Sequence, residues 1–149
     1  MAALAGFYTG HPDVERYPML SEVGGLLAAA LDAADVVINE PVVLPAARLL
    51  ADVDPESDVP GVGPVLQTFA AAALILHWVQ TAEYVATLSQ HFLDNYGYVR
   101  VIGPGGLIES SVVTAGLGVW GAGLHYPRHE HPAEETYHLL HGSASFQRD

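Results

Sequence analysis

The chain lacks both cysteine and lysine, and each absence narrows what it can be. Without cysteine, disulfide bonds and thiolate metal sites are excluded. Its basic residues are five arginines, set against 17 acidic residues, and the formal net charge is −12. So acidic a chain repels phosphate backbones and anionic membrane surfaces, which argues against nucleic-acid and lipid-surface roles. The acidity favours a substrate that carries a positive group, although it is explained more simply as a means of keeping an apolar chain soluble.

Long hydrophobic runs are also missing, although half of the residues are hydrophobic. The longest run, Phe69–Val79, is interrupted by His77 and is far shorter than the roughly 20 residues that cross a bilayer. The N-terminal residues have neither the basic region nor the apolar length of a secretory signal peptide. We therefore expect a globular cytoplasmic protein without a membrane segment.

Hydrophobic spacing predicts a helical part followed by a strand-rich part. Residues 13–35 and 65–93 have helical spacing, and residues 45–51 form a short helix with proline in its first turn. The Asp-, Pro- and Gly-rich stretch 52–64 predicts a loop. Further on, the branched and aromatic residues typical of strands dominate. The expected strands are Tyr98–Ile102, Leu107–Thr114, Leu117–Trp120 and Glu135–Leu140, with a turn at 104–106.

This order of elements predicts an α+β fold in a single domain over residues 1–149. Residues 1–95 are the helical part, and residues 96–149 hold the first strands of an antiparallel β-barrel, on which the helices pack. Phe69–Val79 is apolar nearly all round, so we expect the barrel to cover one side and a second subunit the other, in a possible homodimer. A small barrel needs about eight strands, and only about half that number are recognisable, so we expect an open sheet edge.

One histidine-rich stretch, residues 123–142, carries the clearest chemical signal. Residues two apart in a strand point to the same face, so His129 and His131 would project together, and Glu135 and Tyr137 would do the same from the next strand. Two imidazoles and one carboxylate suit a divalent transition metal (zinc, ferrous iron, manganese, nickel or cobalt) and leave coordination positions open. The alternative is a solvated histidine-rich turn beside Pro132, but the carboxylate at this spacing and the bracketing glycines favour a metal.

These residues also resemble a known family. The spacing of Gly123, His129, His131, Glu135 and Gly142 resembles the first conserved motif of the cupin superfamily at every position. The neighbouring residues, Tyr126-Pro-x-His-x-His-Pro-Ala-Glu-Glu-x-Tyr137, are similar to the cupin-type dimethylsulfoniopropionate (DMSP) lyases. The preceding segment, residues 94–104, and the helical N-terminal half resemble them as well.

The resemblance implies a metal-dependent β-elimination that splits DMSP into dimethyl sulfide and acrylate. His129, His131 and Glu135 match three of the family's metal ligands, and Tyr137 matches the proposed base. Tyr126 matches a second active-site tyrosine. The metal would hold the substrate carboxylate as a Lewis acid. The aromatic faces of Tyr126 and Trp120 are candidates to attract the sulfonium group, unless they serve only in packing.

The fourth ligand of the family is a histidine on a later strand, which we expect beyond Asp149. His138 should face away from Tyr137, and both His138 and His141 are expected on the surface. On this expectation the chain is the N-terminal part of a longer protein whose barrel is completed by about 40–60 further residues. The chain alone would then bind metal weakly and have little activity.

Two other functions stay open at the level of the sequence. Two histidines and one carboxylate also hold the iron of non-haem iron dioxygenases, which would require ferrous iron and dioxygen. A cupin that only senses a metal or a small ligand would bind metal without turning over sulfonium substrates.

Overall fold

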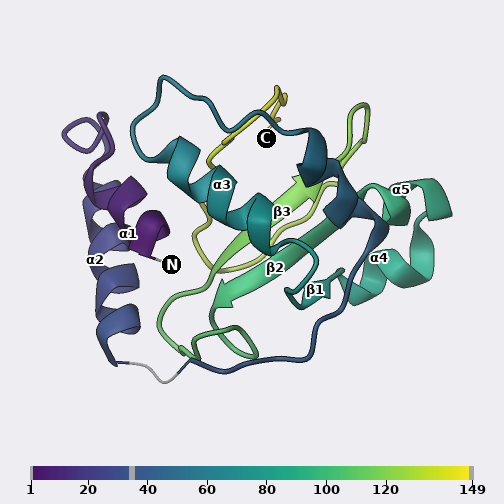
Figure 1. Cartoon of the computed structure of the whole chain (residues 1–149), viewed down its shortest axis with the longest axis horizontal. Coiled ribbons are helices and arrows are strands. Elements are labelled where there is room, and N and C mark those ends of the chain that lie inside the picture. The colour runs from purple at the N-terminus through teal and green to yellow at the C-terminus, as the bar shows by residue number, and fades with distance from the viewer. Residues whose placement is uncertain (1, 34–35, 148–149) are drawn as a thin grey trace.

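The computed structural model describes residues 2–33 and 36–147 and has a mixed α+β structure. Helices α1 and α2 lie side by side at one end of a small sheet, and the short helices α4 and α5 lie at the other end (Figure 1). The elements in chain order are α1 (Ala2–Thr9), α2 (Pro18–Ala33), the 3₁₀ helix η1 (Pro45–Asp52), α3 (Val62–Ala72), β1 (Trp78–Val79), α4 (Ala82–Thr87), α5 (Gln90–Asp94), β2 (Tyr96–Ile102) and β3 (Ala115–Trp120).

The sheet is antiparallel and open, with the order β1-β2-β3. Along β2, alternate residues face opposite sides. Val99 and Val101 pack into the hydrophobic clusters under the helices, whereas Tyr96 lies on the other face, where its register partner across the strands is Trp120. The α+β class predicted from the sequence is confirmed, and so are the two strands expected near 98–102 and 117–120.

The helix predicted over 13–35 is present as α2, but it is shorter than expected. The predicted helix over 13–35 begins only at Pro18, since residues 11–17 form turns, and positions 34–35 lie outside the described residues. Proline suits the first turn of a helix, where its missing N–H is not needed.

Helices α1 and α2 pack closely because of a glycine. A Cβ at Gly24 would stand 2.8 Å from Cγ2 of Thr9 in α1, so this position must be small. Gly24 therefore weakens α2 locally but permits the helix contact.

The single long helix predicted over 65–93 is wrong. Its first part is helical, in α3, but the chain then turns and pairs as a strand at Trp78, so the helix is interrupted. A continuous apolar run does not distinguish a buried helix from a buried strand, and the stretch after Ala73 is rich in branched and aromatic residues. Two further helices start after Thr81 and after Ser89, whose hydroxyl caps α5 by accepting a hydrogen bond from the Phe92 N–H.

Two predicted strands, over 107–114 and 135–140, are also wrong. Ile108 makes one isolated bridge to Ile102, and residues 135–140 form no strand. A strand forms only where a neighbouring backbone is available for pairing. In these two segments the apolar side chains pack into the hydrophobic clusters instead. Ile108 is buried beneath α1 and α2, and Leu140 packs against the cluster around Phe7. The short helix at 45–51 is present as η1, and the loop predicted for 52–64 ends at Val62, where α3 begins.

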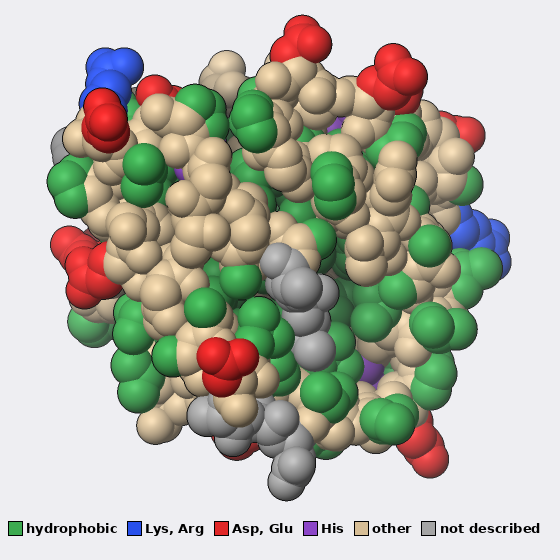
Figure 2. All heavy atoms as spheres, turned by 60° about the vertical axis from the view of Figure 1, so that its left-hand side comes forward, with side chains coloured by type: hydrophobic (Ala, Val, Ile, Leu, Met, Phe, Trp, Pro, Cys, Tyr) green, Lys and Arg blue, Asp and Glu red, His purple; other side chains and the backbone are tan. Residues whose placement is uncertain are grey.

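The face on the α1 and α2 side carries acidic side chains spaced around its edge, with apolar groups between them (Figure 2). Helix α3 buries Val62, Val65, Leu66 and Phe69, whereas Leu74 and Ile75 just beyond it are exposed. The second subunit expected over this region stays a prediction.

In the described part of the chain, no helix combines the length and the hydrophobicity needed to cross a bilayer.

Candidate metal centre

The segment that carries the histidine motif, residues 121–147, follows β3 and forms neither helix nor strand. It changes direction at Gly123 and Gly142, whose φ angles of 77° and 86° lie in the left-handed region that favours glycine. A Cβ at either position would meet open space, so their requirement is conformational rather than steric. The two glycines that bracket the motif therefore have a physical role in shaping this segment.

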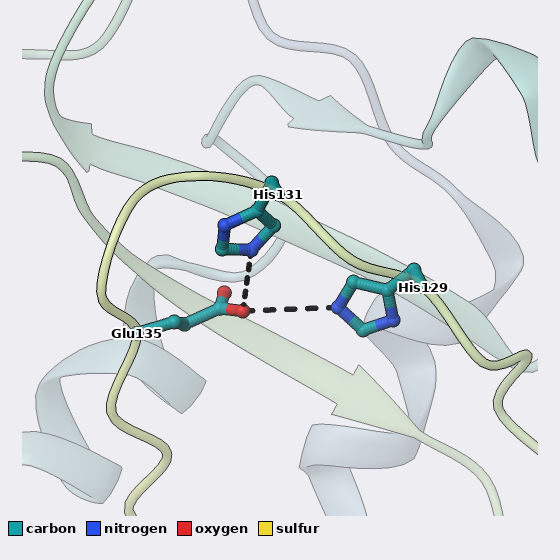
Figure 3. Close-up of side chains that lie close together, drawn as sticks. All are labelled: His129, His131 and Glu135. Atoms are coloured by element: carbon teal, nitrogen blue, oxygen red, sulfur yellow. Dashed lines mark hydrogen bonds and ion pairs between the residues drawn. The ribbon is translucent and has the colours of Figure 1, made fainter. Parts of the chain in front are cut away.

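Three side chains of this segment converge on one point (Figure 3). One ligand atom each from His129, His131 and Glu135 lie within 4.8 Å of one another. The Glu135 carboxylate oxygen Oε2 is 2.9 Å from Nε2 of His131 and 3.7 Å from Nε2 of His129. The strands expected to align them are absent, and a turn over 132–133 brings Glu135 back to the histidines instead.

Backbone carbonyls orient both imidazole rings. Nδ1 of His129 lies 3.2 Å from the Pro127 carbonyl, and Nδ1 of His131 lies 2.9 Å from the Ala133 carbonyl. When Nδ1 carries the proton, each ring donates to that carbonyl and leaves its Nε2 lone pair for a cation placed between Nε2 and Glu135. Metal-binding histidines are typically oriented by such a hydrogen bond from the other ring nitrogen.

The charge and the exposure of the three residues also suit a cation. The hydrogen bond and the negative charge of Glu135 raise the pKa of His131, so in the absence of a metal a proton is attracted to the place where a cation would sit. The side chains of His129, His131 and Glu135 are 34%, 41% and 42% exposed, which leaves room for a ligand from solvent. The donor set and its orientation thus fit a divalent transition metal with open coordination positions.

Both tyrosines predicted for the site lie beside His129, one of the three candidate ligands. The Tyr137 hydroxyl is 3.5 Å from Nε2 of His129, and Tyr126 lies edge-on to the His129 ring at 5.1 Å between centroids. Burial raises the pKa of Tyr137, and the Glu135 charge raises it further. Burial also raises the pKa of Tyr126, with a further contribution from the hydroxyl of Tyr96. Without a positive charge nearby, both phenols are therefore neutral at ordinary pH.

Comparison with known proteins identifies the family. The sequence profile of the dimethylsulfoniopropionate lyases matches residues 11–149. This chain belongs to the DMSP lyase family. The DMSP lyase DddQ of Ruegeria pomeroyi is 35% identical over 106 residues, which are 71% of this chain and 52% of that protein. The chain therefore spans about half the length of this curated relative.

A solved structure from a study titled for the DMSP lyases RdDddP and RnDddQII shares the fold. It matches with a TM-score of 0.62 and 20% sequence identity, over 83% of this chain and 57% of that one. The α+β arrangement of helices around a small antiparallel sheet is therefore one that solved proteins adopt.

An aromatic cluster behind Tyr126 was not predicted from the sequence of this DMSP lyase family member. Tyr84 of α4, Phe92 of α5 and Tyr96 of β2 are buried together and contact the Tyr126 ring. Trp120 completes this aromatic cluster, with its ring centroid 5.6 Å from that of Tyr126 and 6.4 Å from that of Tyr137. The tyrosines of 94–104, within the segment that resembles the family, were the available signal, but their contact with Tyr126 depends on the fold.

His138 is not the surface residue that the sequence suggested. It is half-buried against Phe7, Tyr8 and His11, with ring centroids 5.3, 5.0 and 5.6 Å away. Its Nε2 is buried without a hydrogen-bond partner among the described residues. His141 is exposed, as predicted. His138 thus anchors the ligand segment to α1 and its following turn, three residues beyond Glu135.

This anchor predicts a pH dependence of stability. Burial lowers the pKa of His138, and the nearby His11 lowers it further. The unfolded chain therefore takes up this proton at a higher pH than the folded chain does. The stability that depends on neutral His138 is complete above about pH 6.5 and is lost as the pH falls through the folded-state pKa.

His138→Phe keeps an aromatic ring but cannot titrate, so it should flatten the fall of the melting temperature between about pH 7 and pH 5. Melting curves recorded with a chelator present would measure this without interference from metal binding. His141→Phe, in the same segment but exposed, is the control and should keep the wild-type slope. Equal slopes for His138→Phe and wild type would contradict the anchor.

Proposed function

We propose that this protein is a metal-dependent carbon–sulfur lyase that cleaves DMSP to dimethyl sulfide and acrylate, built on a partial cupin barrel. The observation that carries the proposal is the convergence of His129, His131 and Glu135 beside the Tyr137 hydroxyl, in a chain of the DMSP lyase family. The helices and the open antiparallel sheet are compatible with the first strands of such a barrel.

The three ligands and Tyr137 have complementary tasks in this reaction. Burial and Glu135 hold Tyr137 in its neutral form, so a base role requires a positive charge beside its hydroxyl. A divalent cation on His129, His131 and Glu135 would supply that charge and act as a Lewis acid toward the substrate carboxylate. His129 links the two tasks, because its Nε2 faces both Glu135 and the Tyr137 hydroxyl.

The reaction is a β-elimination started by Tyr137. Its phenolate oxygen takes a proton from the carbon next to the substrate carboxylate. The electron pair left behind forms the C=C bond of acrylate, and the C–S bond breaks with its electrons going to sulfur. The sulfonium thereby becomes neutral dimethyl sulfide, and Tyr137 holds the proton until solvent removes it. A positioned general base of this kind contributes typically about 10²–10⁴ in rate.

The Trp120 and Tyr126 rings of the aromatic cluster provide a place for the sulfonium group. Trp120 and Tyr126 stand at right angles to each other, and Trp120 is 40% exposed and lies next to Tyr137. Aromatic faces attract a cation by about 0.5–2 kcal/mol and cannot react with it. We therefore assign Trp120 and Tyr126 to substrate binding and Tyr137 to proton transfer.

Anaerobic turnover tests the function and separates it from that of an iron dioxygenase. Full-length protein loaded with a divalent metal and incubated with DMSP without dioxygen should release dimethyl sulfide and acrylate in equal amounts, because elimination needs no oxidant. Gas chromatography and liquid chromatography would quantify the two products. Turnover that appears only with ferrous iron and dioxygen would support the dioxygenase instead. Metal binding without any turnover would support a sensor.

A further inference from the structure

Tyr96 lies at the centre of the aromatic cluster and is only 1% exposed. Its ring contacts Phe92 at 5.1 Å, Tyr126 at 5.6 Å and Trp120 at 5.9 Å between centroids. Two of these neighbours, Tyr126 and Trp120, are the residues assigned above to substrate binding. Tyr96 therefore reaches the site through its neighbours, although it contacts none of the three ligands itself.

Polar contacts fix Tyr96 at both its backbone and its hydroxyl. The Gln80 side-chain amide donates to the carbonyls of Tyr96 and Leu93, at 2.7 and 2.6 Å, and so ties β2 to the end of α5. The Tyr96 hydroxyl lies 3.0 Å from Oγ1 of Thr81. Thr81 stands at the start of α4 but makes no side-chain cap for that helix, which leaves its hydroxyl for Tyr96.

Tyr126 needs such support, because its own segment has no helix or strand to hold it. Its position follows from side-chain contacts with Tyr84, Phe92, Tyr96 and Trp120 on one side, and it touches His129 on the other. A group that fixes Tyr126 therefore also limits where the His129 ring stands. Groups that hydrogen-bond directly to a metal ligand typically change metal affinity or activity by about 10–100-fold, and a support one contact further back should have a smaller effect.

We propose that Tyr96, held by Thr81, is a positioning residue that sets the place of Tyr126 and, through it, of the His129 ring. The activity part of this inference rests on the proposed lyase function, whereas the metal-binding part rests on the ligands alone. Ordinary core packing is the competing explanation, and it assigns no role to the Tyr96 hydroxyl.

A double-mutant cycle separates the two explanations. Tyr96→Phe and Tyr126→Phe keep both rings and each remove one hydroxyl, and the double variant completes the cycle. Each single variant should weaken Co²⁺ binding about 3–10-fold and lower kcat/KM for DMSP by a similar factor. The double variant should be no worse than Tyr126→Phe by more than about twofold, because residues that act through one another are not additive.

Control variants test the connection to Thr81. Thr81→Val should reproduce Tyr96→Phe, and Thr81→Ser, which keeps the hydroxyl, should restore wild-type values. Tyr98→Phe removes a hydroxyl from the same strand, where it contacts Arg100, and should bind Co²⁺ as wild type does. Melting temperatures must stay well above the assay temperature in every variant, so that lost packing is not mistaken for lost positioning.

Co²⁺ affinity and kcat/KM within about twofold of wild type in Tyr96→Phe, or fully multiplicative losses in the double variant, would overturn the inference. If the full-length wild-type protein releases no dimethyl sulfide, the proposed function fails, and the Co²⁺ cycle still decides on Tyr96. If turnover is normal and the cycle shows no coupling, Tyr96 is a packing residue only and the proposed function stands.

Discussion

Glu135→Gln is expected to weaken divalent metal binding by about 100-fold or more and to abolish DMSP cleavage, because a neutral amide replaces the only charged ligand of the three. Oε2 of Glu135 is the atom that faces Nε2 of both His129 and His131, and the group of three holds no second carboxylate that could replace it. Isothermal titration with Zn²⁺ or Co²⁺ and a dimethyl sulfide assay would measure the two losses.

Glu134→Gln is the matched control for this variant. It removes the same charge at the preceding position, where the side chain is also exposed but does not belong to the group of three ligands. It should retain metal and activity within about twofold, because exposed charges contribute little at ordinary ionic strength. Equal losses in both variants would show that the acidity of the segment matters and that coordination by Glu135 does not.

Tyr137→Phe is expected to lower kcat by about 10²–10⁴ while the protein keeps its metal, since the change removes only the group that accepts the proton. The Tyr137 ring packs against Trp120 and Phe146, and phenylalanine preserves these contacts. Single-turnover kinetics with metal content measured on the same samples would separate loss of chemistry from loss of the site.

A substrate with deuterium on the carbon next to the carboxylate gives a second, independent test of the role of Tyr137. If removal of this proton limits the rate, the wild type shows a primary isotope effect, and the residual activity of Tyr137→Phe retains it. A loss of kcat smaller than about threefold would reassign proton transfer to Tyr126 or to a water molecule, because a true general base contributes far more.

The three candidate ligands could be picked out from the sequence because they are close along the chain. Only three residues separate His131 from Glu135, so a turn brings them together whether or not strands flank it. The expected strands were wrong, yet the three side chains meet. Short spacing constrains distance more strongly than it constrains secondary structure.

The support behind the ligands was not accessible from the sequence, because it comes from distant segments. Tyr84 and Phe92 fall inside the region predicted as one helix, where no contact with Tyr126 could be foreseen. The split of that region depends on the pairing of Trp78 with Val99, a tertiary contact that overrides local apolar spacing. His138 is a similar case, since its burial depends on α1, at the opposite end of the chain.

X-ray absorption at the edge of a bound Co²⁺ or Zn²⁺ tests the central claim most directly. The wild-type spectrum should show two imidazole ligands at about 2.0–2.1 Å and oxygen donors at about 2.0–2.2 Å, and His131→Ala should lose one imidazole. A wild-type spectrum without imidazole scattering, or one that His131→Ala leaves unchanged, would contradict a metal centre on His129, His131 and Glu135.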